Sequence, residues 1–188
     1  GQDLRFLVGA MQTESANNSS LLYGTMTAET ALMGHSMGGG ASFLAAANNT
    51  EITTLVNFAA AESTPSSTTA SQDVSVPTVI YAGEDDCVAP PVDHQINMYD
   101  SCGSACKYYI GIVLGGHCYF ANYNFNCTLG ESTCNPTLDI TRDAQHAVTF
   151  DFLNLWLDYT LKGDQNSYTV FEDSLYNSPR IIYSESCN

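Results

Sequence analysis

The sequence predicts an α/β fold in which a parallel sheet is flanked by helices. Three observations carry this prediction. First, short apolar segments alternate with segments of helical periodicity. Second, a serine flanked by glycines lies between one apolar segment and the helical segment that follows it. Third, polar side chains follow directly after two of the apolar segments. Strands that alternate with helices pair in parallel, so functional groups gather where their carboxyl ends meet. With 188 residues, 44% of them hydrophobic and 13% charged, the chain suits a single domain over residues 1–188.

Each element of this fold can be placed along the chain. Strands are expected at 29–33, 52–59, 76–82 and 107–114. Helices are expected at 4–15, 38–48, 92–99 and 143–161, and loops at 62–72 and 122–141. The last helix should end at Gly163, and its expected core residues are Phe150, Leu153, Trp156 and Leu157.

Composition excludes several classes of partner. The net charge of −15, from 20 acidic and 5 basic residues, would repel nucleic acid and anionic membrane surfaces. No run of about 18 apolar residues occurs, so we expect no membrane span. The 7 cysteines include no C-x-x-C pair and fit no standard zinc spacing. They favour disulfides in a secreted or periplasmic protein, with no cofactor and no metal.

The segment GHSMGGG, from Gly34 to Gly40, has the G-x-S-x-G pattern between a predicted strand and a predicted helix. In that context the pattern is typical of a nucleophile elbow, which exposes its serine, here Ser36, above the sheet. The backbone N–H of the next residue, Met37, would then stabilise an oxyanion. A serine nucleophile needs a general base, and the base needs an orienting acid.

The partners should follow in the order acid, then histidine. After the strand at 76–82 come Glu84, Asp85 and Asp86, and spacing alone does not choose among them. After the strand at 107–114 comes His117, behind two glycines. The remaining histidines are expected to be structural: His35 beside the serine, and His94 and His146 on helices.

Three motifs, ALMGHSMGGGAS, VPTVIYAGEDDCVAPP and LGGHCYFAN, occur in this order between Ala31 and Asn122. As a set they resemble α/β-hydrolases of the dienelactone-hydrolase-like and cutinase-like polyester hydrolase (PET hydrolase-like) group. In that group the acid precedes a short segment ending in Ala-Pro, so the resemblance favours Asp86. It implies a serine ester hydrolase that forms an acyl-enzyme, with polyesters among its expected substrates. Tyr119 and Phe120 either line an acyl pocket or pack in the core.

The resemblance covers only the C-terminal half of that fold. The strands that precede the elbow in the family, and the loop that supplies the second oxyanion donor, are not expected in this chain. The strand at 29–33 would therefore form an edge of the sheet. Because an apolar edge invites pairing, we expect a homo-oligomer or association with a missing N-terminal segment.

The cysteines suggest how the site could be braced. Cys87 follows the candidate acid and Cys118 follows the candidate histidine, so a Cys87–Cys118 bridge would join their loops. Cys102–Cys106 and Cys127–Cys134 would close small loops and leave Cys187 unpaired, although the sequence leaves other connectivities open. Two alternatives also stay open: a non-catalytic binding or assembly module, and a zinc site at His117, Cys118, Cys127 and Cys134.

Overall fold

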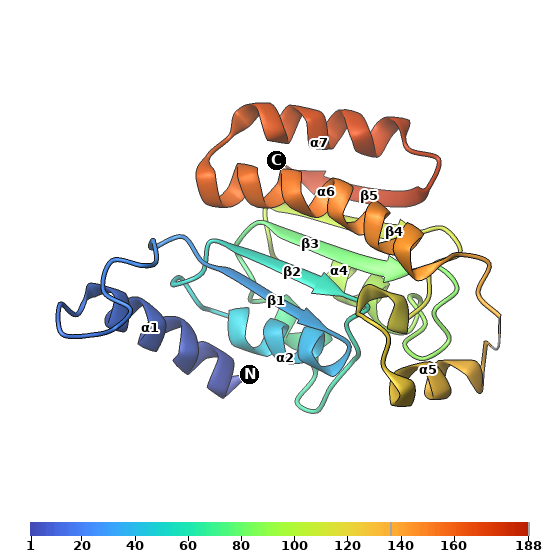
Figure 1. Ribbon diagram of the computed structural model, residues 1–188, viewed down its shortest axis with the longest axis horizontal. Coiled ribbons are helices and arrows are strands. Elements are labelled where there is room, and N and C mark those ends of the chain that lie inside the picture. Colours follow the sequence, from blue (N-terminus) through green and yellow to red (C-terminus); the bar gives the residue numbers. More distant parts are fainter. Residues whose placement is uncertain (136, 188) are drawn as a thin grey trace.

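The computed structural model describes residues 1–135 and 137–187. Its centre is a five-stranded sheet in the order β1-β2-β3-β4-β5 (Figure 1). The strands are β1 Ala31–His35, β2 Thr54–Phe58, β3 Thr78–Gly83, β4 Cys106–Ile112 and β5 Ile181–Cys187. The first four are parallel, which confirms the predicted strands, and β5 returns antiparallel to β4. Strand β5 was not expected from the sequence.

Seven α-helices and one short 3₁₀ helix are found within the described ranges. They are α1 Gln2–Ala16, α2 Met37–Ala46, α3 Ser67–Ser71, α4 Gln95–Ser101, η1 Cys118–Phe120, α5 Phe125–Ser132, α6 Arg142–Lys162 and α7 Gln165–Asn177. The four predicted helices correspond to α1, α2, α4 and α6. Helices α3 and α5 lie inside segments that were expected to be loops, and α7 was not expected.

The sheet is covered by helices on both faces, which gives three layers (Figure 1). Successive strand side chains point to opposite faces, so Leu55 and Ile80 pack with α1, α2 and α4, while Val56 and Val79 pack with α6 and α7. All four of these side chains are fully buried. The continuous apolar character of the inner strands thus reflects burial on both faces.

Helix α6 supplies the largest buried side chain on its face of the sheet, Trp156. The indole N–H of Trp156 donates to the hydroxyl of Thr54 on β2 at 2.9 Å, which fixes the helix against the sheet. The helix ends at Gly163 in the left-handed conformation (φ 71°), as predicted. The core assignment of Phe150 was wrong: this side chain is 52% exposed, because it lies on the outer face of α6.

At the other side of the sheet, β1 pairs only with β2 among the described residues. The predicted edge position of the strand before Ser36 is therefore confirmed for this part of the chain. Within the same ranges, no helix combines the length and apolar character that a membrane crossing requires.

Candidate active site

Ser36 lies in the tight turn between β1 and α2 and has a positive φ, with φ 56° and ψ −124°. A non-glycine residue seldom takes such a φ, so its neighbours must hold it there. The Ser36 N–H donates to the carbonyl of Phe58, and its own carbonyl accepts from the N–H groups of Gly40 and Ala61, all at 2.9–3.1 Å. The turn is thus fastened to both β2 and α2.

The glycines of the motif permit this turn. At Gly34 a Cβ would overlap the carbonyl of Gly38, and at Gly39 it would overlap Ala60. The strand and the helix therefore approach more closely than a side chain at Gly34 would allow, which is the packing reason for the first glycine of the G-x-S-x-G pattern.

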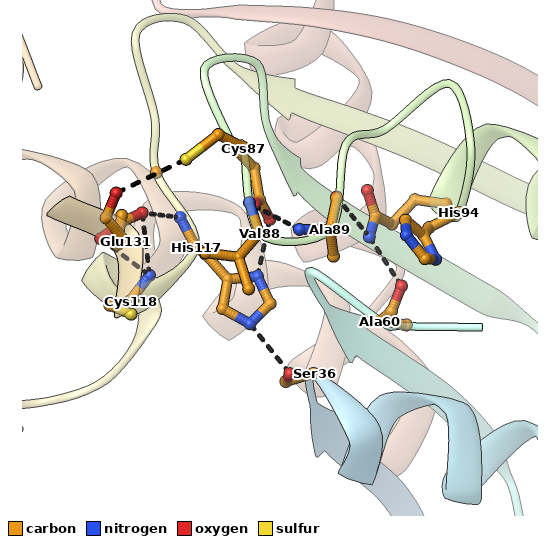
Figure 2. Close-up of polar contacts among 12 residues, drawn as sticks. Ser36, Ala60, Cys87, Val88, Ala89, His94, His117, Cys118 and Glu131 are labelled. Carbon is orange, nitrogen blue, oxygen red and sulfur yellow. Dashed lines mark hydrogen bonds and ion pairs between the residues drawn. The ribbon is translucent and has the colours of Figure 1, made fainter. Parts of the chain in front are cut away.

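The three candidate side chains meet above the carboxyl ends of the strands. The Nε2 atom of His117 lies 2.8 Å from the Oγ of Ser36 (Figure 2), and its Nδ1 lies 2.7 Å from Oδ2 of Asp86. Asp86 follows β3 and His117 follows β4, and both are at least 96% buried. The other oxygen of Asp86, Oδ1, accepts from the N–H groups of Val88 and Ala89, each at 2.8 Å.

The two competing acids lie elsewhere. Glu84 accepts a hydrogen bond from the hydroxyl of Tyr109 at 2.7 Å, so it points toward β4 and away from the imidazole. Asp85 is exposed. Of the three acids, Asp86 alone contacts the ring of His117.

His35 contacts the backbone of His117. Its Nε2 lies 2.9 Å from the carbonyl of His117, and because a carbonyl can only accept, this nitrogen carries the proton. Burial, followed by the nearby His117, lowers the pKa of His35 from its usual value, which favours the neutral ring. His94 instead accepts the N–H of Glu62 through Nδ1 at 2.9 Å.

The predicted oxyanion and substrate residues have different surroundings. Met37 is the first residue of α2, so its N–H has no partner within the helix. The ring of Phe120 packs at a tilt against the rings of Phe58 and His35, with centroid distances of 5.9 and 6.3 Å. Tyr119 instead packs beneath the guanidinium of Arg142, 4.4 Å from its ring centre. Phe120 therefore lies beside His35, while Tyr119 contacts Arg142 of α6.

The disulfide predictions were wrong. The bridges are Cys87–Cys134, Cys106–Cys187 and Cys118–Cys127, and Cys102 is a free, buried thiol. The predicted pairs Cys87–Cys118, Cys102–Cys106 and Cys127–Cys134 are absent. The loops of the acid and the histidine do meet, but their cysteines are not bonded to each other. Cys118 is bonded to Cys127 in α5, and Cys87 to Cys134 just after α5. These bridges also exclude the alternative zinc site in this structure. Its three cysteines, Cys118, Cys127 and Cys134, are disulfide-bonded, and bonded sulfurs supply no thiolate ligand.

Sequence reasoning missed the residues that hold the histidine loop. The side-chain amide of Gln145 on α6 both accepts from the N–H and donates to the carbonyl of Gly116, at 3.0 and 2.9 Å. Glu131 on α5 accepts from the N–H groups of His117 and Cys118. No local pattern marks either residue, since both act at a distance of many residues.

Comparison with known proteins identifies the family of the chain. A family model described as PETase, PET hydrolase-like, matches residues 2–134, a range that contains Ser36, Asp86 and His117. A search of curated proteins found no match to this sequence. The family match covers most of the chain and supports an ester-bond hydrolase. The chain belongs to the PET hydrolase-like family.

Proposed function

We propose that this protein is a serine carboxylic-ester hydrolase that acts through Ser36, His117 and Asp86. One observation carries the proposal: a continuous hydrogen-bonded path runs from the serine hydroxyl through the imidazole to a buried carboxylate, with links of 2.8 and 2.7 Å. The family match supports ester-bond hydrolysis in general. The roles of the individual residues are inferred from this geometry.

In the proposed reaction, Oγ of Ser36 attacks the ester carbonyl while Nε2 of His117 takes the hydroxyl proton. The resulting oxyanion accepts a hydrogen bond from the N–H of Met37. The C–O bond to the alcohol then breaks, and His117 returns the proton to the leaving oxygen. Water then attacks the acyl carbonyl while the same nitrogen takes its proton. The bond between the acyl carbon and Oγ breaks, the carboxylic acid leaves, and His117 returns the proton to Oγ of Ser36. Asp86 fixes the tautomer of His117 and stabilises the imidazolium.

The family match supports ester hydrolysis in general, and the surface near Ser36 limits the class of ester that we propose. Phe120 provides an apolar contact next to the site, and the side chain of Met37 is 78% exposed. The segment after β2 carries only the small residues Ala59 to Ala61, so it offers no aromatic surface to a polymer. We therefore propose small apolar esters as the primary substrates. Polyester cleavage is a second proposed activity, and its rate should be compared with the rate on small esters.

The experiment is the Ser36→Ala variant, assayed with p-nitrophenyl esters and probed with a fluorophosphonate. We expect the wild-type protein to hydrolyse the esters and to be labelled at Ser36. The variant should lose both properties and keep its thermal transition. An unlabelled, inactive wild-type protein would instead favour the non-catalytic binding module, and a variant that retains turnover would exclude Ser36 as nucleophile.

Two further proposals concern the surroundings of the enzyme. The three disulfides fit an oxidising compartment, and we propose secretion.

The edge strand β1 is bordered by an apolar cavity of about 560 Å³ between it and α1. We propose that this edge is covered by a second copy of the chain or by another segment. Light scattering that gives a stable monomer of 20.3 kDa would count against the second copy.

A further inference from the structure

The histidine loop has to cross the sheet to reach the serine. Ser36 follows β1 and His117 follows β4, three strands away in the order of the sheet. Neighbouring strands lie about 4.8 Å apart, so these two strands are separated by roughly 14 Å. Yet Nε2 of His117 lies 2.8 Å from Oγ of Ser36. The sheet alone therefore does not position the imidazole, and other contacts must hold the loop.

Glu131 makes the most unusual of these contacts. Its side chain comes from α5 and is only 2% exposed. Its carboxylate accepts from the backbone N–H groups of His117 and Cys118, and it approaches His117 from the side opposite Ser36 (Figure 2). A buried carboxylate is costly unless it is hydrogen-bonded. Among the ion pairs of the described ranges, none involves Glu131, so these backbone donors compensate its burial.

The disulfides fasten the same helix to both loops. Cys118, next to His117, is bonded to Cys127 within α5. Cys87, next to Asp86, is bonded to Cys134, two residues beyond the end of α5. The short helix is therefore attached covalently to the loop of the base and to the loop of the acid, and Glu131 lies between the two attachment points.

We propose that α5 is a clamp for the catalytic histidine and that Glu131 is its positioning residue. This proposal rests on the proposed ester hydrolysis. The carboxylate sets the position of the His117 backbone and thereby keeps Nε2 within reach of Ser36 and Nδ1 within reach of Asp86. Misplacement of a catalytic group by about 1 Å can reduce the rate by roughly 10²-fold.

The test compares Glu131→Ala, Glu131→Gln and, as a matched control on the exposed side of the same helix, Ser132→Ala. We expect Glu131→Ala to lower kcat by about 10²-fold with little change in KM. The glutamine retains one acceptor oxygen for the N–H of His117 but loses the negative charge that strengthens this bond, so its kcat should fall measurably, by about tenfold. Ser132→Ala should match the wild type. A merely structural role would lower the melting temperature without this graded, kcat-specific loss.

A second measurement does not depend on turnover. The proton between Nδ1 of His117 and Asp86 should give a downfield NMR resonance, which the wild type and Ser132→Ala should show and Glu131→Ala should lose. A folded alanine variant that keeps both this resonance and kcat would overturn the clamp. If the alanine variant does not fold, a glutamine variant with wild-type kcat and resonance would overturn it as well. Wild-type protein that shows the resonance but no more hydrolysis than Ser36→Ala would instead refute the proposed function.

Discussion

Replacing Asp86 by asparagine isolates the role of the acid. In the structure, Oδ1 of Asp86 accepts two backbone N–H bonds, from Val88 and Ala89, each at 2.8 Å. An asparagine must therefore keep its carbonyl oxygen at this position, since an NH₂ group there would face two donors. Its NH₂ group is then turned toward Nδ1 of His117, which must become an acceptor. The ring proton moves to Nε2 and points at Ser36, so the imidazole can no longer accept the serine proton.

The size of this effect follows from the tautomer that His117 is forced to adopt. The variant keeps the shape and the backbone contacts of the acid but holds His117 in the wrong tautomer, a change that costs about 10⁴-fold in kcat. This corresponds to a barrier higher by about 5 kcal/mol, at 1.36 kcal/mol for each factor of ten. The assay is p-nitrophenyl ester hydrolysis, with burst kinetics to separate acylation from deacylation. We expect the loss in kcat with a nearly unchanged melting temperature.

Asp85→Asn is the matched control, because Asp85 is the exposed neighbour of Asp86 and makes no side-chain contact with His117 in the described structure. It should retain wild-type kcat. The reasoning would be refuted if Asp86→Asn stayed within about tenfold of the wild-type rate, or if the control lost as much activity as the test variant.

Three further predictions concern stability. Burial raises the pKa of Glu62, but hydrogen bonds led by that from Thr68 outweigh it and lower the pKa from 4.5 to about 2. A carboxylate with a depressed pKa stabilises the folded state only while it is ionised. Glu62→Gln should therefore lower the urea midpoint at pH 7. The difference in midpoint from the wild type should vanish as the pH falls from 4.5 toward 2. Gly34→Ala should destabilise the protein by about 3 kcal/mol or prevent folding, because the new Cβ overlaps the Gly38 carbonyl. Gly38→Ala should fold normally, because its Cβ meets open space. Urea titrations compare the stability of the two variants. Trp156→Phe should cost about 2–4 kcal/mol in the same assay, because it removes buried volume and the bond to Thr54, and an unchanged midpoint would contradict the role of this contact.

The C-terminal region shows where sequence patterns lose their predictive power. Strand β5 was not predicted because, apart from Ile181, its residues are exposed on both faces, so no alternation of apolar and polar residues marks it. It pairs with β4 through backbone hydrogen bonds and is tied to it by Cys106–Cys187. The predicted Cys102–Cys106 pair was wrong for the same reason: without β5 in the expected fold, Cys106 had no distant partner to consider.

The two halves of the candidate site differ in the same way. The elbow around Ser36 is held by contacts among residues close in sequence, such as the close approach of Gly34 and Gly38, and this local demand on the backbone leaves a recognisable motif. The position of His117 depends on α5 and α6, whose contacts come from Glu131 and Gln145, 14 and 29 residues beyond the groups they bind. Such contacts constrain only single side chains in otherwise unremarkable helices. Strand ends and chain order could therefore predict that Ser36, His117 and one of the acids after β3 meet, and the family resemblance selected Asp86 among those acids. Neither could predict what holds the histidine in reach of the serine.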